Sequence, residues 1–515
     1  MRDAFGEEDG EILYNGIRLP SQWPPIRSSL TSDPPPPPPY LESPPAIIQI
    51  EVGRQLFVDD FLIESTTLKR TFHKAVYLPN NPILKPDRPW ECEGEYPTAM
   101  VFSDGVWYDP KEHLFKMWYM GGYFRSTCYA LSEDGINWVK PELDVIQGTN
   151  IVHTARRDSS TVWLDLEEED IKRRYKLSLY ELDGKGAVTI YLSADGIHWG
   201  EPVERSGPCG DRTTVFYNPF RKVWVFSIRE GLPGVGRCRR YREHRDVVVG
   251  ARWRRGEPTL WVGADRLDPP RDDLKVQPQL YNLDAVAYES LMLGLFTIWR
   301  GQPADRAKPN EICLGFSRDG FHWYRPDRRA FIPVSERYGD WNWGNVQSAG
   351  GCCLIVKDKL YFYVSGRAGE RGTPGSGICS TGLAVLRRDG FASMEAGEIE
   401  GTLTTRLLRF RGRYLFVNVA VPKGELRVEI LDEGGQPVEP FKLENCLPIR
   451  ADSTAWMVRW KGGDDLSSLT GEPVRFRFHL RKGKLYAFWV SPKRSGASYG
   501  YVAAGGPGFS DPLDI

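Results

Sequence analysis

The sequence predicts an all-β protein in which a five-bladed β-propeller is followed by a C-terminal antiparallel β-sandwich. A turn motif recurs along the middle of the chain at a nearly constant spacing, and short strand-like runs precede each copy. The chain of 515 residues is 12% aromatic and holds 52 Gly and 39 Pro, a balance that favours short strands and tight turns over helices. No convincing amphipathic helix of any length interrupts this pattern.

The N-terminal part, residues 1–50, has little periodicity and contains six consecutive prolines, Pro34 to Pro39. Such a run favours an extended polyproline II conformation. We expect an arm that lies on the surface of the body, with a flexible linker as the alternative.

The repeated motif defines the propeller, which we assign to residues 51–395. Residues 132–138, 193–199 and 317–323 read SEDGINW, SADGIHW and SRDGFHW, and a shorter copy, RDGF, contains Asp389. The motif aspartates, at 134, 195, 319 and 389, are 61, 124 and 70 residues apart, and 124 is twice 62. One copy is therefore missing near residue 257, with Trp253 as its remnant. Asp-Gly supplies a hairpin turn, and the trailing Trp can wedge against a neighbouring sheet.

Two or three strand-like runs lie upstream of each turn. In chain order they are 98–102, 114–119 and 127–131; 161–164, 175–180 and 187–192; 213–217 and 223–228 with a divergent third strand; 286–289, 291–299 and 311–316; and 348–356, 360–365 and 382–386. Four short strands per unit of about 60 residues is typical of a propeller blade.

The register of the repeat stops after Asp389. Residues 402–419, 426–431, 457–460 and 474–490 alternate apolar and polar side chains between Asp/Gly turns. This pattern predicts an antiparallel β-sandwich over residues 396–515.

Charge and cysteine content limit the partners. The formal net charge is -1, so nothing favours a nucleic acid or an anionic membrane. No secretory signal or membrane-spanning run is evident. The nine Cys lack metal-type pairing, and adjacent Cys352 and Cys353 look like buried thiols. A cytoplasmic protein is the simplest interpretation, and the arm and sandwich are candidate surfaces for a homo-oligomer.

Acidic residues stand at the start of two predicted inner strands. Asp158 lies in RRDSSTVWLD (156–165), and Asp211 lies four residues ahead of Val215 in CGDRTTVFYNP (209–219). A strand that is apolar on both faces lies deep in a stack of sheets, so a carboxylate at its first residue would point into the enclosed space. We predict that both acids face one central cavity. The alternative is that each caps a turn.

Further candidates follow from the same reasoning. Glu289 is a lone carboxylate in the apolar run AYESLM (287–292), where burial would raise its pKa; pairing with a structural Arg such as Arg300 is the alternative. Arginines at strand ends could bind sugar hydroxyls, a sugar carboxylate or a phosphate, or pair with the acids. Tryptophans could stack on sugar rings, although core packing uses them equally. The predicted substrate-binding set is Glu95 (or Glu93), Arg157, Arg212, Asp284, Arg300, Trp341, Trp343, Asn345 and Arg367.

The turn motifs, the LFVDDFLI opening (56–63) and the C-terminal sandwich resemble the five-bladed glycoside hydrolases. These include the invertase and levanase group (family 32) and the arabinanase and xylosidase group (family 43), and the resemblance is strongest to a bacterial branch with this opening. It covers about residues 50–510 and rests on architecture. The Asn-Asp-Pro-Asn-Gly signature of invertases is absent, and their Glu-Cys motif has an echo in Glu91-Cys92, which is too early in the chain.

The resemblance implies a reaction and roles. Glycoside hydrolysis needs a proton donor and a second carboxylate, and these families add a third acid that tunes the donor. It implies Glu289 as general acid and Asp158 and Asp211 as base or nucleophile and pKa-tuning acid, in either order. We expect no cofactor; a channel His helps hold calcium in related propellers, so a structural or channel Ca²⁺ near His153 stays open.

The expected function is hydrolysis of a terminal sugar from an oligosaccharide or glycoside, with a furanoside as one option. A glycoside phosphorylase of a related propeller family is one alternative, because one such family uses phosphate in place of water. A non-catalytic carbohydrate-binding propeller is the other, since a fold does not fix a function.

Overall fold

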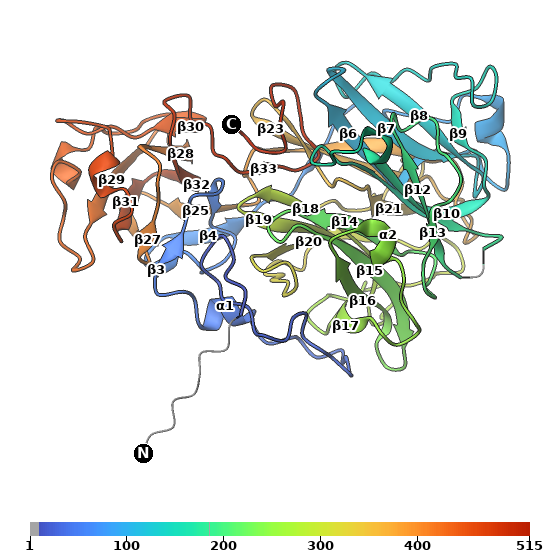
Figure 1. Cartoon of the computed structure of the whole chain (residues 1–515), viewed down its shortest axis with the longest axis horizontal. Helices are drawn as coiled ribbons and strands as arrows, with labels where there is room; N and C mark the ends of the chain where they lie inside the picture. Colours follow the sequence, from blue (N-terminus) through green and yellow to red (C-terminus); the bar gives the residue numbers. More distant parts are fainter. Residues whose placement is uncertain (1–9, 185) are drawn as a thin grey trace.

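The computed structural model describes residues 10–184 and 186–515, which form a propeller and a sandwich side by side (Figure 1). The predicted fold class, an all-β propeller with a β-sandwich, is confirmed by the strand pairing. The short helices of the described residues are α1 (Pro39–Glu42), α2 (Val247–Gly250) and the 3-10 turns Pro89–Cys92, Ile171–Arg173, Leu443–Asn445 and Ser467–Leu469. None of these helices is long and apolar enough to cross a membrane.

The propeller consists, in the described residues, of five sheets that follow one another along the chain. The first sheet is β6 (Ala99–Asp109), β7 (Leu114–Gly121), β8 (Ser126–Ser132) and β9 (Ile151–His153). The second is β10 (Arg157–Leu164), β11 (Tyr175–Glu181), β12 (Val188–Ser193) and β13 (Glu204–Arg205). The third is β14 (Thr214–Asn218), β15 (Val223–Leu232), β16 (Gly236–His244) and β17 (Thr259–Gly263).

The last two sheets recruit strands from the chain ends. The fourth is β18 (Gln279–Glu289), β19 (Leu291–Trp299) and β20 (Glu311–Ser317), with β33 (Tyr501–Val502) beside β18. The fifth is β21 (Asn345–Ser348), β22 (Leu354–Val356), β23 (Lys359–Arg367) and β24 (Cys379–Arg387), completed by β5 (Val76–Tyr77). Pairing of β5 with β24 thus fastens the last sheet to the N-terminal part of the chain.

Hydrogen bonds between neighbouring sheets close the ring. Trp107 Nε1 donates to Val162 O at 2.8 Å, between β6 and β10. Asn282 Nδ2 donates to Ser348 Oγ at 3.1 Å, between β18 and β21, and Val101 N donates to Thr381 Oγ1 at 2.8 Å, between β6 and β24. The inner strands are buried on both faces; all eight residues of β10 are buried. Their β-branched and aromatic side chains fill the space between sheets.

The repeated Asp-Gly turns hold adjacent sheets together. Asp134 Oδ1 accepts from the backbone N of Ile136 and of Asn137, both at 2.8 Å. These and further hydrogen bonds outweigh partial burial and lower the pKa of Asp134 to about 2. Trp138 packs edge-on against Tyr363 of the fifth sheet, 5.7 Å between ring centroids, which is the wedge that the motif predicts.

Where the spacing places the missing copy of the motif, the structure has no Asp-Gly turn. The connection from β16 to β17 contains α2, whose N-terminus is capped by Asp246. Trp253 follows it, buried against Phe226 with 5.3 Å between ring centroids. The turn has been replaced by a capped helix, while the packing tryptophan remains.

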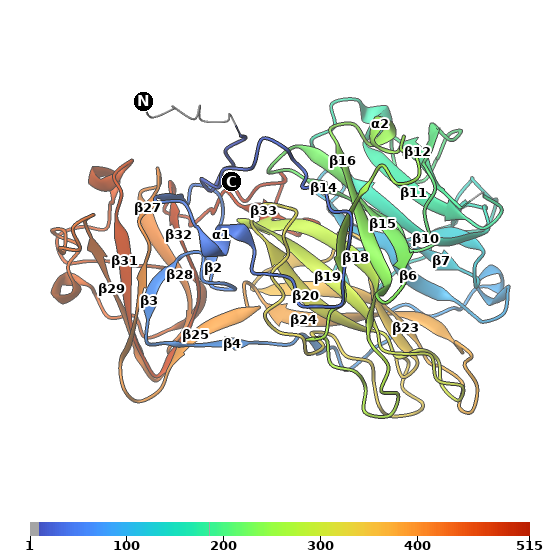
Figure 2. The same ribbon diagram turned by 90° about the horizontal axis from the view of Figure 1, so that it is seen from below.

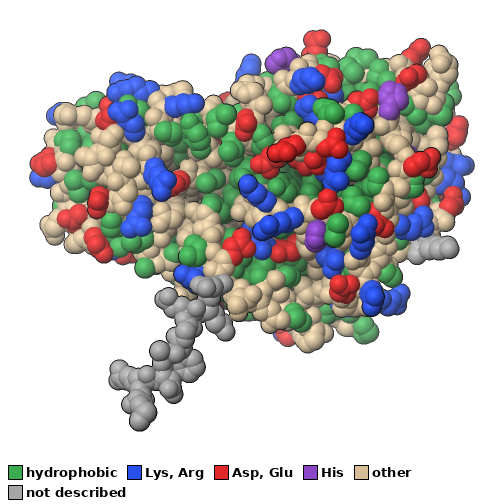
Figure 3. All heavy atoms as spheres, in the orientation of Figure 1, with side chains coloured by type: hydrophobic (Ala, Val, Ile, Leu, Met, Phe, Trp, Pro, Cys, Tyr) green, Lys and Arg blue, Asp and Glu red, His purple; other side chains and the backbone are tan. Residues whose placement is uncertain are grey.

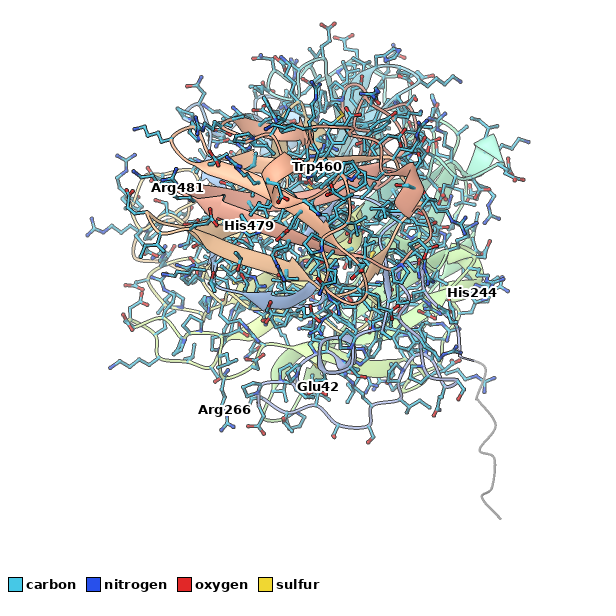
Figure 4. All side chains as sticks on the ribbon, turned by 90° about the vertical axis from the view of Figure 1, so that its left-hand side faces the viewer. Glu42, His244, Arg266, Trp460, His479 and Arg481 are labelled. Atoms are coloured by element: carbon cyan, nitrogen blue, oxygen red, sulfur yellow. The ribbon has the colours of Figure 1, made fainter. Side chains whose placement is uncertain are left out.

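The sandwich has two sheets with their own hydrophobic core. One contains β30 (Asp452–Met457), β28 (Tyr414–Ala420), β32 (Gly483–Ser491), β25 (Ala392–Ala396), β4 (Lys69–Phe72) and β2 (Gln55–Leu56). The other contains β29 (Glu425–Leu431), β31 (Arg475–Arg481), β26 (Gly401–Thr405) and β3 (Ile63–Thr66); β1 (Ile48–Gln49) pairs separately with β27 (Leu408–Arg409). Phe476, Phe478 and Leu480 of β31 are buried between more exposed neighbours, and His479 and Arg481 lie on the face seen in Figure 4.

The predicted boundaries at 51 and 396 differ from the strand pairing. Residues 55–72 contribute β2, β3 and β4 to the sandwich, and β25 joins it from residue 392 (Figure 2). At the other end, β33 returns to the propeller. The physical reason is that strand pairing is nonlocal, so the alternation of a strand indicates a buried face but not the sheet that it joins.

The proline arm lies on the body, as predicted. Arg27 N donates to Thr259 Oγ1 at 2.7 Å, and the arm from Arg27 to Pro39 forms one wall of a groove whose other wall includes Trp261 and Trp323. Cys352 and Cys353 are buried thiols, also as predicted. The visible surface mixes acidic and basic side chains without a field of one sign (Figure 3).

Candidate active site

Charged side chains from four sheets meet at the end of the ring where β10 and β14 begin. We define the axial site as Asp158, Asp211, Arg212, Lys308 and Arg367. Asp158 is the second residue of β10, Asp211 and Arg212 precede β14, Lys308 lies between β19 and β20, and Arg367 ends β23. Ser159 Oγ donates to Asp211 O, which ties the start of β10 to the loop before β14.

Asp158 is the most strongly perturbed acid of the axial site. It is 8% exposed, and its Oδ1 is buried without a hydrogen-bond partner among the described residues. Burial and, next, the charge of Asp211 raise its pKa to about 6, against the opposing charges of Arg212, Arg367 and Lys308. A carboxyl group with this pKa exchanges its proton near neutral pH.

Asp211 has a different environment. Its side chain is 43% exposed and makes a long ion pair, 3.5 Å, with Arg229 Nε. It therefore faces solvent while Asp158 is enclosed. Two neighbouring carboxyl groups in unlike surroundings can take the roles of proton donor and proton acceptor.

Arg212 and Arg367 lie near Asp158 and are held beside the same aromatic ring, that of Phe102. Arg212 is 2% exposed, donates from Nη2 to Ser103 Oγ at 3.0 Å and stacks on the Phe102 ring at 3.9 Å. Arg367 donates from Nη1 to Ser376 Oγ at 3.1 Å and lies 5.5 Å from the same ring. A ring on β6 thus positions cations from the third and fifth sheets.

Beneath the axial site, further predicted residues form its supporting layer. Asp284 Oδ2 accepts from Ser348 Oγ at 2.5 Å and from Ser103 Oγ at 3.1 Å, and burial raises its pKa. Arg157 pairs with Asp104 at 2.9 Å and donates to the backbone O of Asp158 at 3.1 Å. These two residues fix the inner strands instead of meeting a ligand.

The structure does not bring Glu289 to the axial site. It lies five residues along β18 from Asp284, which at about 3.3 Å per residue is a separation of about 16 Å. Its carboxylate contacts Arg388 Nη2 at 2.9 Å and Arg54 Nε at 3.4 Å, and accepts from Ser498 Oγ at 2.7 Å. Burial raises its pKa. Its contacts are those of a structural ion pair with arginines, the alternative interpretation, although the partners are Arg388 and Arg54.

Arg300 and the two tryptophans also have structural surroundings. Arg300 pairs with Glu311 at 3.3 Å and not with Glu289. Trp341 lies against Gly366 and Gly382, where an added Cβ would come within 2.1 Å of its ring. Trp343 is 8% exposed beneath Arg306, 4.7 Å from ring centroid to guanidinium. Packing thus buries Trp343, whereas Trp341 is half-buried against these glycines.

Asn345 and Glu95 lie at the edge of the site. Asn345 Nδ2 donates to Lys308 O at 2.8 Å and so holds the loop that carries Lys308. Glu95 is exposed next to Tyr96, whose pKa is raised to about 12 by burial and by Glu95. Tyr96 in turn packs edge-on against Tyr123, a partner of Arg367.

Sequence reasoning missed Lys308, Tyr281, Arg237 and Phe102. Lys308 lies in a loop without a motif. Tyr281 is the extra residue of a bulge between Leu280 and Asn282, and Ser103, with φ of +63°, lies where the register of β6 shifts. Bulges and a positive φ turn side chains toward the axis in a way that strand alternation does not predict. The sequence signal that could have identified Phe102 and Tyr281 is an aromatic residue near the start of an inner strand.

No metal site accompanies these residues: residues 10–184 and 186–515 contain no group of three or more His, Cys, Asp or Glu side chains placed to hold an ion. His153 lies at the outer strand β9, 4.7 Å from the ring centroid of Tyr191.

No protein-family model and no curated protein matches the chain. Similar solved structures include an N-acetylgalactosamine deacetylase from F. plautii, with 15% identity, 60% of this chain and 97% of that chain covered, and a TM-score of 0.39. A thermostable family-43 glycoside hydrolase has 12% identity, 58% and 96% coverage and a TM-score of 0.39. A family-43 arabinoxylan arabinofuranohydrolase from Bacillus subtilis has 11% identity, 82% and 99% coverage and a TM-score of 0.38.

Structural neighbours thus include glycoside hydrolases of family 43, the group that the turn motifs and sandwich resemble. TM-scores below 0.5 do not by themselves establish a common fold. The propeller assignment therefore rests on the strand pairing, and the site on its own contacts.

Proposed function

We propose that the protein is a glycoside hydrolase that removes a terminal sugar at the axial site. The observation that carries this proposal is the pair Asp158 and Asp211, one enclosed with a pKa raised to about 6 and the other 43% exposed. Hydrolysis of a glycosidic bond uses two carboxyl groups, a proton donor and a nucleophile or base. The recessed position of Asp158, 8% exposed, suits a chain end better than the middle of a polymer.

The two acids take different roles. Asp158 donates its proton to the leaving oxygen, because burial keeps part of its population protonated near neutral pH. Asp211 is open to solvent and acts as the nucleophile or activates the water. The general-acid role first given to Glu289 thus passes to Asp158. Arg212 and Arg367 stabilise the carboxylate that Asp158 becomes.

The test is turnover on a panel of aryl pyranosides and furanosides. Wild-type protein is expected to release the aryl group from at least one of them, and Asp158→Asn and Asp211→Asn to lose about 10²–10⁴-fold in kcat. Far-UV circular dichroism and the melting temperature serve as folding controls. Full activity in both folded variants, or glycan binding without any turnover, would contradict the proposal.

Phosphorolysis is a second candidate because basic residues surround Asp158. A phosphorylase replaces the attacking water by phosphate and needs a single acid beside a cluster of cations. Arg212, Arg367 and Lys308 provide such a cluster. Turnover that requires added phosphate would favour this candidate over hydrolysis.

A further inference from the structure

Four cationic side chains lie near Asp158 or near Tyr281, and none makes a direct salt bridge with a carboxylate among the described residues. Asp158 and Asp284 act on some of them only at longer range. Around Tyr281, the charged groups of Arg212, Arg237 and Lys308 lie 5.9, 5.5 and 5.1 Å from the ring centroid. Arg367 lies beside the Phe102 ring on which Arg212 stacks. Among residues 10–184 and 186–515, no carboxylate oxygen lies within 4.0 Å of a side-chain nitrogen of these four residues.

Most other buried arginines among the described residues are paired with an acid. Arg239 is not, and its guanidinium donates to the backbone O of Arg212 and of Tyr281. Arg157 contacts Asp104 at 2.9 Å, Arg318 contacts Asp59 at 2.8 Å, and Arg54 contacts Asp389 at 2.9 Å. A guanidinium withdrawn from water without a counter-charge is costly. The exceptions therefore need an explanation, and they gather at one place, around the proposed proton donor.

The unpaired arginines retain free donors. Arg212 Nε and Nη1 and Arg367 Nε are buried and have no hydrogen-bond partner among the described residues. Both guanidinium groups are fixed, Arg212 by Ser103 and Phe102 and Arg367 by Tyr123 and Ser376. Planar donors held in place match the oxygens of carboxylates and phosphates, and their rigidity reduces the entropy lost on binding.

We propose that Arg212 and Arg367 form an oxyanion pocket beside Asp158, which takes the carboxylate of an acidic sugar or inorganic phosphate. This inference rests on the proposed function. If the pocket binds a sugar carboxylate, the substrate is an acidic glycoside; if it binds phosphate, phosphate is the group that attacks the glycosidic bond. Lys308 and Arg237 flank the entrance, where Arg237 Nη1 has a neutral partner, Gln279 Oε1 at 2.8 Å. Their positive charge attracts the anion toward the pocket.

Binding is tested without relying on turnover. Isothermal titration calorimetry of the full chain at constant ionic strength would use sodium glucuronate, inorganic phosphate and neutral glucose as probes. At least one anion is expected to bind tenfold or more tightly than glucose. Arg212→Gln and Arg367→Gln are each expected to weaken that anion tenfold or more, whereas Arg494→Gln, at a 60% exposed position of the sandwich, leaves it unchanged.

A second set of variants tests the pocket if Arg212→Gln or Arg367→Gln does not fold. Lys308→Gln, at a half-buried position, should weaken the anion several-fold, and Arg212→Lys should keep the charge but lose the planar fork, with intermediate affinity. Equal binding of anions and glucose would overturn the pocket. So would wild-type anion affinity in folded Arg212→Gln and Arg367→Gln.

Turnover then distinguishes the two anions and separates this inference from the proposed function. Faster cleavage of aryl uronides than of the neutral glycosides, without phosphate, supports a sugar carboxylate; cleavage of neutral glycosides only with phosphate supports phosphate. Tight anion binding with no turnover of any glycoside would support the oxyanion pocket and contradict the proposed hydrolase. Cleavage of neutral glycosides with no anion binding would support the hydrolase and contradict the pocket.

Discussion

Asp158, at the axial site, and Glu289, at the far end of β18, show two ways to bury an acid in the propeller. At the axial end, Asp158 of the neighbouring β10 has a raised pKa and an Oδ1 without a hydrogen-bond partner among the described residues. At the far end, Glu289 is also buried with a raised pKa, but Arg54, Arg388 and Ser498 contact its carboxylate. Both acids are buried, so burial does not distinguish them. The proposed proton donor differs from Glu289 in lacking partners that contact its carboxylate among the described residues.

The cluster at Glu289 joins parts of the chain that are distant in sequence. Asp389 accepts from Tyr288 OH at 2.6 Å and from Asn418 Nδ2 at 2.9 Å, and Arg388 also contacts Asp514 at 3.1 Å. Propeller, sandwich and C-terminal segment meet in this one network. Its charges hold the two bodies together, whereas those of the axial site are available to a ligand.

The largest effect is expected for Asp158→Asn. The amide cannot donate a proton to a leaving group, so kcat should fall by about 10²–10⁴-fold on whichever aryl glycoside the wild type cleaves. The amide fits the same space, so the melting temperature at pH 7 should not fall. Steady-state kinetics and differential scanning calorimetry measure the two quantities, and a variant with wild-type kcat would remove Asp158 from the reaction.

Glu289→Gln should have the opposite signature. Removing this charge leaves Arg388 and Arg54 short of a partner in a buried network, which costs about 3–5 kcal/mol of unfolding free energy. Turnover per folded molecule should persist. Urea denaturation measures the loss, and Glu398→Gln, at a 78% exposed position, is the control that should stay within about 0.5 kcal/mol of wild type.

The pH dependence should follow the raised pKa of Asp158. Because its pKa is about 6 in the folded protein and lower when unfolded, the folded state binds the proton more tightly, and this group lowers stability as pH rises from about 4 to about 6. Asp158→Asn removes that penalty, so it should stabilise the protein at pH 7.5 by up to about 3 kcal/mol relative to its effect at pH 4. Denaturation at the two pH values tests this. A stability difference between variant and wild type that is independent of pH would contradict the perturbed pKa.

The smallest effect is expected at Asp134, a turn acid that is exposed and hydrogen-bonded within its own turn. Asp134→Ala removes hydrogen bonds to the backbone N of Ile136 and Asn137 and should lower the unfolding free energy by about 1 kcal/mol. Turnover should be unchanged. Thermal denaturation and the same aryl-glycoside assay check both statements, and a loss of activity in folded protein would show that the turns influence the axial site.

Much of the fold follows from the sequence because the repeat is local. The Asp-Gly turns, the apolar inner strands and even Trp253 at the place of the missing copy can be read from spacing. Membership of the sandwich cannot, because β2 and β3 pair with strands more than 300 residues away. Loops, bulges and edge strands carry no periodic signal of their partners.

The same distinction explains the candidate site. Asp158, Asp211, Arg212 and Arg367 stand next to strand ends, a position that sequence reveals, and the structure brings them together. Glu289 also ends a strand, in an apolar run, but its partners Arg54 and Arg388 lie 235 and 99 residues away. Lys308 and Tyr281 depend on a loop and a bulge. The environment of a buried acid is set by distant residues, so only the structure separates the two cases.

The most direct measurement compares Asp158→Asn with Glu289→Gln in one assay. The quantity is kcat/KM per folded molecule on the best aryl glycoside. The contrast between the two acids predicts that the first variant is nearly inactive and the second close to wild type. Comparable activity in both variants, or loss in Glu289→Gln alone, would contradict the assignment of the reaction to the axial site.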